Sequence, residues 1–140
     1  MAIVSRIFSV PAADSGKAAA HFKAKLEVET DPSDLHHDLK NKVAGIVVVD
    51  GRRATSYELG HVPGAVNLYH ADINAQTTAT WSKEDIYVCT CTGVGCNAST
   101  KAALNLASLG FRVKELIGGM KEWEAEGYEI AIGKEPGQLS

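Results

Sequence analysis

Three cysteines, Cys89, Cys91 and Cys96, lie within eight residues of one another. They follow an apolar run at residues 86–88 and lead into a helix-forming stretch that begins at residue 97. This order predicts a strand, a tight loop and a helix. A thiol at such a junction faces backbone amides of the loop and of the first helical turn, whose partial positive charge stabilises a thiolate or a bound anion. The sequence therefore predicts an active site in this loop.

Cys91 is the strongest candidate for the nucleophile. It is expected to end its strand, and the loop at residues 92–95 is short enough to point its amides inward, with two glycines that permit the backbone angles of an amide nest. A thiolate held there is a nucleophile near neutral pH. Cys89, two residues earlier in the strand, is expected to be a small buried residue. Three interpretations of Cys96 stay open: a resolving thiol for Cys91, a helix-cap residue, or a residue with no role.

The same cysteines, together with His61 or His70, provide enough ligands for a metal ion. Their pattern is Cys-x-Cys-x4-Cys, whereas zinc sites usually pair cysteines two to four residues apart on two knuckles. We therefore expect neither a metal ion nor another cofactor.

Phosphoryl transfer is the competing chemistry for a thiol after a strand. Thiol phosphatases place an arginine after five intervening residues, where it clamps the phosphoryl oxygens. In this chain that position is Asn97, and the loop contains no arginine or lysine. Since catalysis of phosphoryl transfer depends mostly on charge stabilisation, the sequence argues against it.

Asp50, Arg52 and His61 are the expected supporting residues. Arg52 and Arg53 follow Asp50 at a strand end, where an arginine can form an ion pair with Asp50 or with Glu58. His61 precedes a proline in a rigid turn. A histidine there is expected to hydrogen-bond a neighbouring strand rather than to act in catalysis.

Size and charge bound the class of protein. A chain of 140 residues is most simply one domain with a real core. The net charge of −3 argues against nucleic acid as a partner, and no apolar run approaches the length of a membrane helix. The N-terminus lacks the pattern of a signal peptide. The cysteines are odd in number and clustered, so they do not form a disulfide framework. A cytoplasmic location is expected.

Strand and helix patterns alternate along the chain. We expect residues 1–25 to form a helical extension, 26–132 the main domain and 133–140 a frayed tail. This alternation predicts an α/β domain with a central, mainly parallel five-stranded sheet flanked by helices. Strands are expected at residues 26–30, 46–50, 65–68, 86–91 and 112–117, and helices at 11–25, 32–41, 55–59, 97–109 and 120–126.

These motifs together resemble the rhodanese-like (sulfurtransferase) domain family. The resemblance covers residues 26–128 and rests on VVDGR at 48–52, Tyr57, GHVPGAVNL at 60–68, IYV at 86–88 with Cys91, LGF at 109–111, and LIGG at 116–119 with Trp123 and Gly127. It implies an α/β domain in which Cys91 carries a persulfide sulfur. It also implies that this sulfur is surrounded by the backbone amides of Thr92, Gly93, Val94, Gly95, Cys96 and Asn97.

The sequence departs from the family pattern at several points. The middle residue of Asp-x-Arg is Gly51 instead of an apolar residue, and Ser56 replaces the usual acidic residue before the aromatic one. The loop after Cys91 is about two residues longer than the compact one and lacks the arginine often found there. A longer loop implies a wider pocket, and an uncharged loop implies weaker attraction for a dianion such as thiosulfate.

The resemblance implies a single-domain sulfurtransferase. It would move a sulfane sulfur from thiosulfate or a protein persulfide, through a Cys91 persulfide, to an acceptor such as cyanide or a thiol. Two alternatives are a redox protein with a reversible Cys91–Cys96 disulfide and a non-catalytic binding module. The expected partners are the sulfur donor and the thiol acceptor, with no nucleic acid and no membrane.

Overall fold

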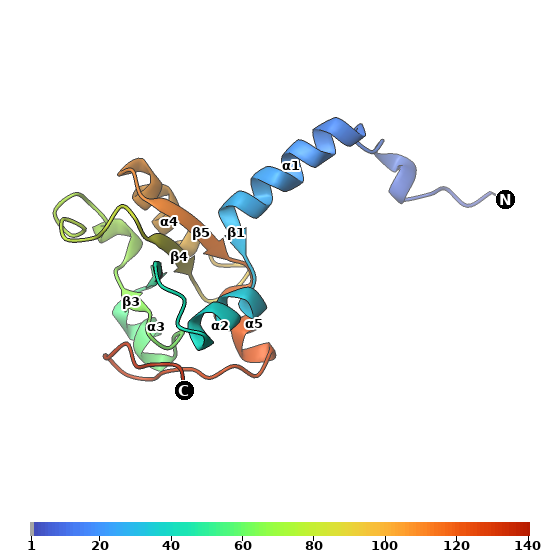
Figure 1. The fold of residues 1–140 in the computed structure, drawn as a ribbon. Helices are drawn as coiled ribbons and strands as arrows, with labels where there is room; N and C mark the ends of the chain where they lie inside the picture. Colours follow the sequence, from blue (N-terminus) through green and yellow to red (C-terminus); the bar gives the residue numbers. More distant parts are fainter. Residues whose placement is uncertain (1) are drawn as a thin grey trace.

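The computed structural model describes residues 2–140 and contains a five-stranded sheet in which every paired strand is parallel (Figure 1). The strand order is β1-β5-β4-β2-β3. The predicted α/β fold with a central parallel sheet is therefore confirmed. The strands are β1 (Glu29–Thr30), β2 (Ile46–Asp50), β3 (Val66–Asn67), β4 (Ile86–Thr90) and β5 (Arg112–Leu116).

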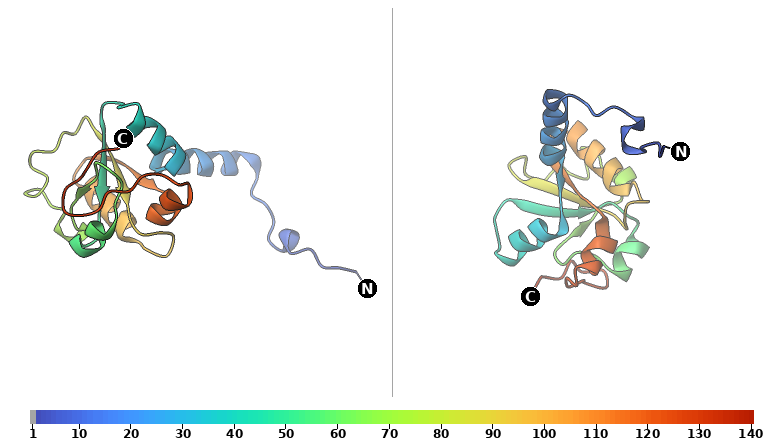
Figure 2. Two further views of the ribbon diagram at one scale, coloured as in Figure 1. Left: turned by 90° about the horizontal axis from the view of Figure 1, so that it is seen from below. Right: turned by 90° about the vertical axis from the view of Figure 1, so that its right-hand side faces the viewer.

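Helices cover both faces of the sheet (Figures 1 and 2). The helices are α1 (Ser15–Val28), α2 (Pro32–Lys40), α3 (Ala54–Leu59), α4 (Ala98–Ser108) and α5 (Gly119–Ala125), with short 3-10 turns η1 (Ile7–Ser9) and η2 (His70–Asp72). None of the helices within residues 2–140 is both long enough and apolar enough to cross a membrane.

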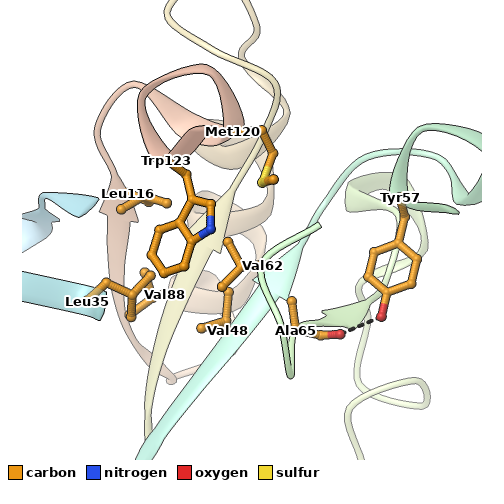
Figure 3. Packing of buried hydrophobic residues seen from close by; sticks show 9 residues of the cluster. All are labelled: Leu35, Val48, Tyr57, Val62, Ala65, Val88, Leu116, Met120 and Trp123. Atoms are coloured by element: carbon orange, nitrogen blue, oxygen red, sulfur yellow. Dashed lines mark hydrogen bonds between the residues drawn. The ribbon is translucent and has the colours of Figure 1, made fainter. Parts of the chain in front are cut away.

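One core lies between the sheet and helices α2, α3 and α5 (Figure 3). Trp123 of α5 is fully buried, and its indole N–H donates to the carbonyl oxygen of Glu129 at 2.7 Å. The Tyr57 hydroxyl donates to the carbonyl oxygen of Ala65 at 2.6 Å, which ties α3 to the start of β3. The other members of this core are Leu35, Val48, Val62, Val88, Leu116 and Met120.

The second core lies on the opposite face, under α4 and the long loop after β3. It uses the alternate residues of the same strands, because successive side chains of a strand point to opposite faces. Cys89 belongs to this core and is fully buried, which confirms the prediction that it is a core residue. Its other members are Val49, Ile73, Tyr87, Ala102, Leu106 and Phe111.

The helix before the sheet is longer than the sequence indicates. Asp14 caps α1 by accepting from the Lys17 N–H, and the helix continues to Val28. The edge strand predicted at residues 26–30 is therefore reduced to the two residues of β1. Two large apolar side chains of α1, Phe22 and Leu26, are 59% and 73% exposed. They are exposed because α1 projects away from the sheet (Figures 1 and 2).

The C-terminal segment is held against the domain, and the prediction of a frayed tail is wrong. The Gly64 N–H donates to the carbonyl oxygen of Pro136 at 2.8 Å. The Gly133 N–H donates to the carbonyl oxygen of Glu58 at 2.8 Å. Ser140 donates from both its backbone N–H and its hydroxyl to the carboxylate of Glu129. These contacts fix residues 133–140 beside α3 and the turn that follows it.

Candidate active site

The cysteine loop lies at the carboxyl end of the parallel sheet, where α/β proteins commonly bind ligands. A cavity of about 280 Å³ opens there between the loop, the first turn of α4 and the segment that follows β5. Cys91 lines it and is the first residue after β4, not the last residue of the strand as predicted. The cavity is also lined by Glu29, Gly93, Val94, Cys96, Ser99, Thr100, Glu115, Leu116, Ile117, Gly118 and Gly119.

The Cys91 sulfur is surrounded mainly by groups that accept hydrogen bonds. It lies 3.3 Å from the carbonyl oxygen of Cys96 and 3.6 Å from that of Gly93. Its third neighbour is the hydroxyl oxygen of Ser99, at 3.2 Å. Burial raises the pKa of the Cys91 thiol, and the Ser99 hydroxyl and backbone N–H, which can donate to the sulfur once it is a thiolate, offset this only in part. The resting form of Cys91 is therefore the thiol.

Cys96 has the opposite environment. Burial alone would raise the pKa of the Cys96 thiol, but hydrogen bonds from the N–H groups of Ala98 and Thr92 lower it. The neighbouring Cys91 thiol and the positive charge of Arg52 add to this effect, so the pKa of Cys96 is lowered. The two thiols thus influence each other, and one amide of the expected cradle, that of Thr92, acts on Cys96 together with the amide of Ala98.

The remaining loop residues differ in exposure. Gly93 is buried, whereas Thr92, Val94, Gly95 and Asn97 are exposed, and Val94 is 91% exposed. Cys89 faces the second core, and burial, with the nearby charge of Glu115, raises the pKa of its thiol to about 12. Cys89 therefore does not share the cavity with Cys91 and Cys96.

Helix α5 holds the first residues of the loop. The Met120 N–H donates to the carbonyl oxygen of Cys91 at 2.8 Å, and the Lys121 N–H donates to that of Thr92 at 2.9 Å. This approach requires Gly119, because a Cβ at that position would overlap the Cys91 carbonyl group. Gly119 also has a φ of 56°, which glycine adopts without strain. The glycine pair at residues 118–119 therefore positions the loop.

Three side chains outside the loop complete the site, and the sequence analysis missed all of them. The Ser99 hydroxyl, in the first turn of α4, donates to Glu115 Oε2 at 2.9 Å. The Thr100 hydroxyl donates to the same oxygen at 2.9 Å. Glu115 lies on β5, where its Cα pairs with that of Cys89. The available signal was the adjacency of the two parallel strands, which brings the residues after β4 close to the end of β5.

Asp50 and Arg52 form a buried pair at the end of β2. Arg52 Nη2 lies 2.7 Å from Asp50 Oδ2, and Nε lies 3.0 Å from Oδ1. Arg52 also donates to the carbonyl oxygen of Gly60, which joins the end of β2 to the end of α3. The expected ion pair is therefore present. It lies outside the cavity lining and reaches the site through its charge, which acts on Cys96.

The packing of the fold also explains why a glycine, Gly51, lies between Asp50 and Arg52. A Cβ there would lie 2.9 Å from the Cβ of Ala102 and 3.0 Å from the carbonyl oxygen of Ala98. The departure from the family pattern at this position therefore lets α4 approach the end of β2 closely.

His61 is fully buried and lies away from the cavity. Its Nδ1 is 2.8 Å from the carbonyl oxygen of Tyr57, and its ring stacks on the Tyr57 ring. Its Nε2 is 3.1 Å from the carbonyl oxygens of both Glu135 and Pro136. His61 thus joins the turn after α3 to the C-terminal segment. Among residues 2–140, no three His, Cys, Asp or Glu side chains are grouped so as to hold a metal ion.

Comparison with known proteins gives relatives of this fold. The chain is 30% identical over 133 residues to the HTH-type transcriptional regulator Rv0324 of Mycobacterium tuberculosis. That match covers 94% of the chain but only 57% of the regulator's length.

Solved structures give a similar result. The chain is similar to the BH2092 protein from Bacillus halodurans, with 44% identity, a TM-score of 0.82, and coverage of 86% of this chain and 88% of that one. A thiosulfate sulfurtransferase from Pseudomonas aeruginosa shares the fold at a TM-score of 0.66 and 18% identity, over 89% of this chain and 22% of that one. The sequence model of the rhodanese-like domain matches residues 31–126. The chain therefore belongs to the rhodanese-like domain family.

Proposed function

We propose that the protein is a sulfurtransferase that carries a sulfane sulfur as a Cys91 persulfide. The observation that carries this proposal is the place of the Cys91 thiol, at the end of β4 and on the wall of an open cavity. Membership of the rhodanese-like domain family supports it, as does the shared fold of a thiosulfate sulfurtransferase.

The reaction has two steps. In the first, the Cys91 thiolate attacks the outer sulfur of the donor, the donor bond to that sulfur breaks, and the leaving group keeps the electron pair. In the second, an acceptor thiolate or cyanide attacks the outer sulfur of the Cys91 persulfide and restores Cys91. This is covalent catalysis by a nucleophile, so ping-pong kinetics are expected.

The charge of the cavity bears on the donor. Two carboxylates, Glu29 and Glu115, line it, and none of its lining residues in the described part of the chain is a lysine or arginine. Like charges repel more strongly where water is partly excluded. Of the two donor classes, thiosulfate and a persulfide on a protein or small thiol, the persulfide therefore fits this cavity better than the thiosulfate dianion.

Intact-mass measurement tests the proposal. After incubation with a persulfide donor, the wild-type protein should gain the mass of one sulfur atom, and cyanide should remove it. Cys91→Ser should gain none, while Cys89→Ala, altered in the core outside the cavity, should still gain it. Sulfur loading of Cys91→Ser equal to wild type would exclude Cys91 as the carrier.

A reversible Cys91–Cys96 disulfide is the second candidate function. It is favoured by the contact of the Cys91 sulfur with the carbonyl oxygen of Cys96 at 3.3 Å and by the cavity that the two residues share. Mild oxidation by a disulfide reagent should then remove two titratable thiols, a dithiol should restore them, and Cys96→Ser should prevent the loss. A Cys96→Ser protein that still accepts sulfur from a persulfide would assign the carrier role to Cys91 alone.

A further inference from the structure

Cys91, Ser99 and Glu115 form a continuous hydrogen-bonded chain. The Cys91 sulfur lies 3.2 Å from the Ser99 hydroxyl oxygen, and this hydroxyl lies 2.9 Å from Glu115 Oε2. The three residues come from the loop, from α4 and from β5, and all three line the cavity. The chain therefore connects the buried thiol to a carboxylate that borders the space where a substrate would bind.

The protons of this chain have one favoured arrangement. Ser99 has a single hydroxyl proton, and an ionised carboxylate can only accept a hydrogen bond, so this proton points to Glu115. The Ser99 oxygen is then free to accept the proton of the Cys91 thiol. Two more neighbours of that sulfur, the carbonyl oxygens of Gly93 and Cys96, also only accept, and the one donor beside it in the described residues, the Ser99 backbone N–H, cannot take up a proton. Cys91 therefore rests as a thiol and needs a path for its proton.

The positions of these groups are fixed by the fold. Ser99 is 3% exposed in the first turn of α4. Glu115 is held on β5, next to β4 on one side and β1 on the other, and its Oε2 accepts a second hydrogen bond from Thr100. The carboxylate is thus oriented toward Ser99 without a rearrangement.

We propose that Glu115 accepts the Cys91 proton through the Ser99 hydroxyl and returns it to a thiol leaving group, which makes a persulfide the donor that this site is built for. This proposal rests on the proposed sulfurtransferase function and goes further, because it assigns a proton acceptor and selects the class of donor.

The step balances for a donor persulfide R–S–SH. The Cys91 sulfur bonds to the outer sulfur, and the donor S–S bond breaks with its electron pair going to the leaving thiolate RS⁻. The Cys91 proton passes to the Ser99 oxygen while the Ser99 proton passes to Glu115. The resulting carboxylic acid then protonates RS⁻. The products are the Cys91 persulfide and the thiol RSH, with no net oxidation or reduction.

The two donor classes should respond oppositely to the loss of the Glu115 charge. A thiolate leaving group is basic, with a pKa of about 8.5, and gains from a positioned acid. Thiosulfate releases sulfite, which depends less on protonation, and as a dianion it is repelled by the carboxylate. Glu115→Gln keeps the shape of the side chain and removes both the charge and the ability to take a proton.

The kinetic test uses cysteine persulfide and thiosulfate as donors. For Glu115→Gln we expect kcat with cysteine persulfide to fall by about tenfold or more, and kcat/KM with thiosulfate to rise. Ser99→Ala should show the same loss with persulfide and no gain with thiosulfate. Glu29→Gln removes the other carboxylate of the cavity, which Lys25 partly balances at 3.7 Å, without touching the relay, so it should show a smaller thiosulfate gain and lose less with persulfide. Glu124→Gln, which removes an exposed carboxylate on α5 outside the cavity, is the control for the loss of a surface charge.

The pH dependence of alkylation gives a readout independent of turnover. Iodoacetamide modification of Cys91, followed by peptide mapping, reports the fraction of thiolate. Glu115→Gln should lower the pKa of Cys91, because it removes a negative charge and frees Ser99 to donate to the sulfur. The other titratable groups near Cys91 are Cys96, Glu29 on β1 and Lys121 on α5, and they are unchanged in this variant. More thiolate combined with slower persulfide turnover is the signature of a lost proton relay.

Several results would overturn the relay. One is a Glu115→Gln variant that equals wild type with cysteine persulfide, or one that loses activity with both donors alike. An unchanged alkylation profile would do the same, and this can be measured even in a variant with no turnover. A wild-type protein that takes sulfur from neither donor would instead refute the sulfurtransferase function.

Discussion

The backbone of Gly119 packs so closely on the carbonyl group of Cys91 that no side chain fits between them. The contact joins the start of α5 to the first residue of the candidate catalytic loop. It is reinforced by the hydrogen bond from the Met120 N–H to the Cys91 carbonyl oxygen. Positioning of the nucleophile therefore depends on a glycine 28 residues later in the chain.

Gly119→Ala should displace the loop and reduce sulfur loading of Cys91. The added Cβ overlaps the Cys91 carbonyl and is also strained at this positive φ, so the variant should lose more than about 2 kcal/mol of unfolding free energy. Denaturant unfolding and intact-mass measurement check the two effects. Gly127→Ala is the matched control, since its φ is 78° but its Cβ would have open space. It should lose about 1 kcal/mol and keep full loading. Equal behaviour of the two variants would contradict the overlap.

The three thiols should be alkylated in a defined order. The pKa of Cys96 is lowered by the N–H groups of Ala98 and Thr92 in spite of burial, whereas burial raises the pKa of Cys91. As pH rises, the thiolate of Cys96 forms first, so iodoacetamide near pH 8 should modify Cys96 before Cys91. Cys89, with a pKa of about 12, should stay unmodified. Peptide mapping of a time course measures this order.

Cys96→Ser provides the control for the coupling between the two thiols. The Cys96 thiolate charge raises the pKa of Cys91, so its removal should shift the alkylation profile of Cys91 to lower pH. A profile that stays in place would show that the two sulfurs do not influence each other.

Neighbouring arginines should differ strongly in their contribution to stability. Arg52→Met leaves the fully buried carboxylate of Asp50 without its partner, and should cost about 3–5 kcal/mol of unfolding free energy. Arg53→Met removes an exposed cation 4.5 Å from the Tyr69 ring centre and should cost less than about 1 kcal/mol. Urea unfolding of both variants tests this, and similar losses would contradict the assigned role of Arg52.

Thr90→Val should stabilise the protein. The Thr90 hydroxyl is fully buried at the end of β4 and has no hydrogen-bond partner within residues 2–140. A valine has nearly the same shape and removes the unsatisfied group, so the unfolding free energy should rise by about 1 kcal/mol. Thr78→Val is the comparison, because the buried Thr78 hydroxyl donates to the carbonyl oxygen of Asn74 at 2.8 Å. It should lose about 1 kcal/mol. Thermal unfolding of both variants measures this difference in stability.

Local signals predicted the parts of the fold that depend on neighbours in the chain. Asp31 and Pro32 begin α2, and the β-branched run at residues 46–50 forms β2 with the predicted limits. The error at residues 26–30 has a clear cause. Alternating apolar and charged residues also fit an exposed helix, and only the pairing of Glu29 and Thr30 with β5 decides where the strand begins.

The site was predictable only in part, for the same reason. Cys91 and its loop follow from a strand, glycines and a helix that are contiguous in sequence. Ser99 and Glu115 reach Cys91 through the parallel register of β4 and β5, which no local pattern encodes. The sequence also could not predict where the amides of the cysteine loop point, because this depends on how α5 holds the loop carbonyl groups.

Helix α1 buries none of its side chains and extends from the domain, to which its last turn is attached through β1 and a hydrogen bond from Lys114 Nζ to the Leu26 carbonyl oxygen (Figure 2). The heat capacity change of unfolding follows the apolar surface that becomes exposed, and α1 exposes that surface already in the folded state. Calorimetry should therefore record a cooperative unit that corresponds to residues 29–140 and not to the whole chain. Residues 2–28 should melt at lower temperature, outside the main transition.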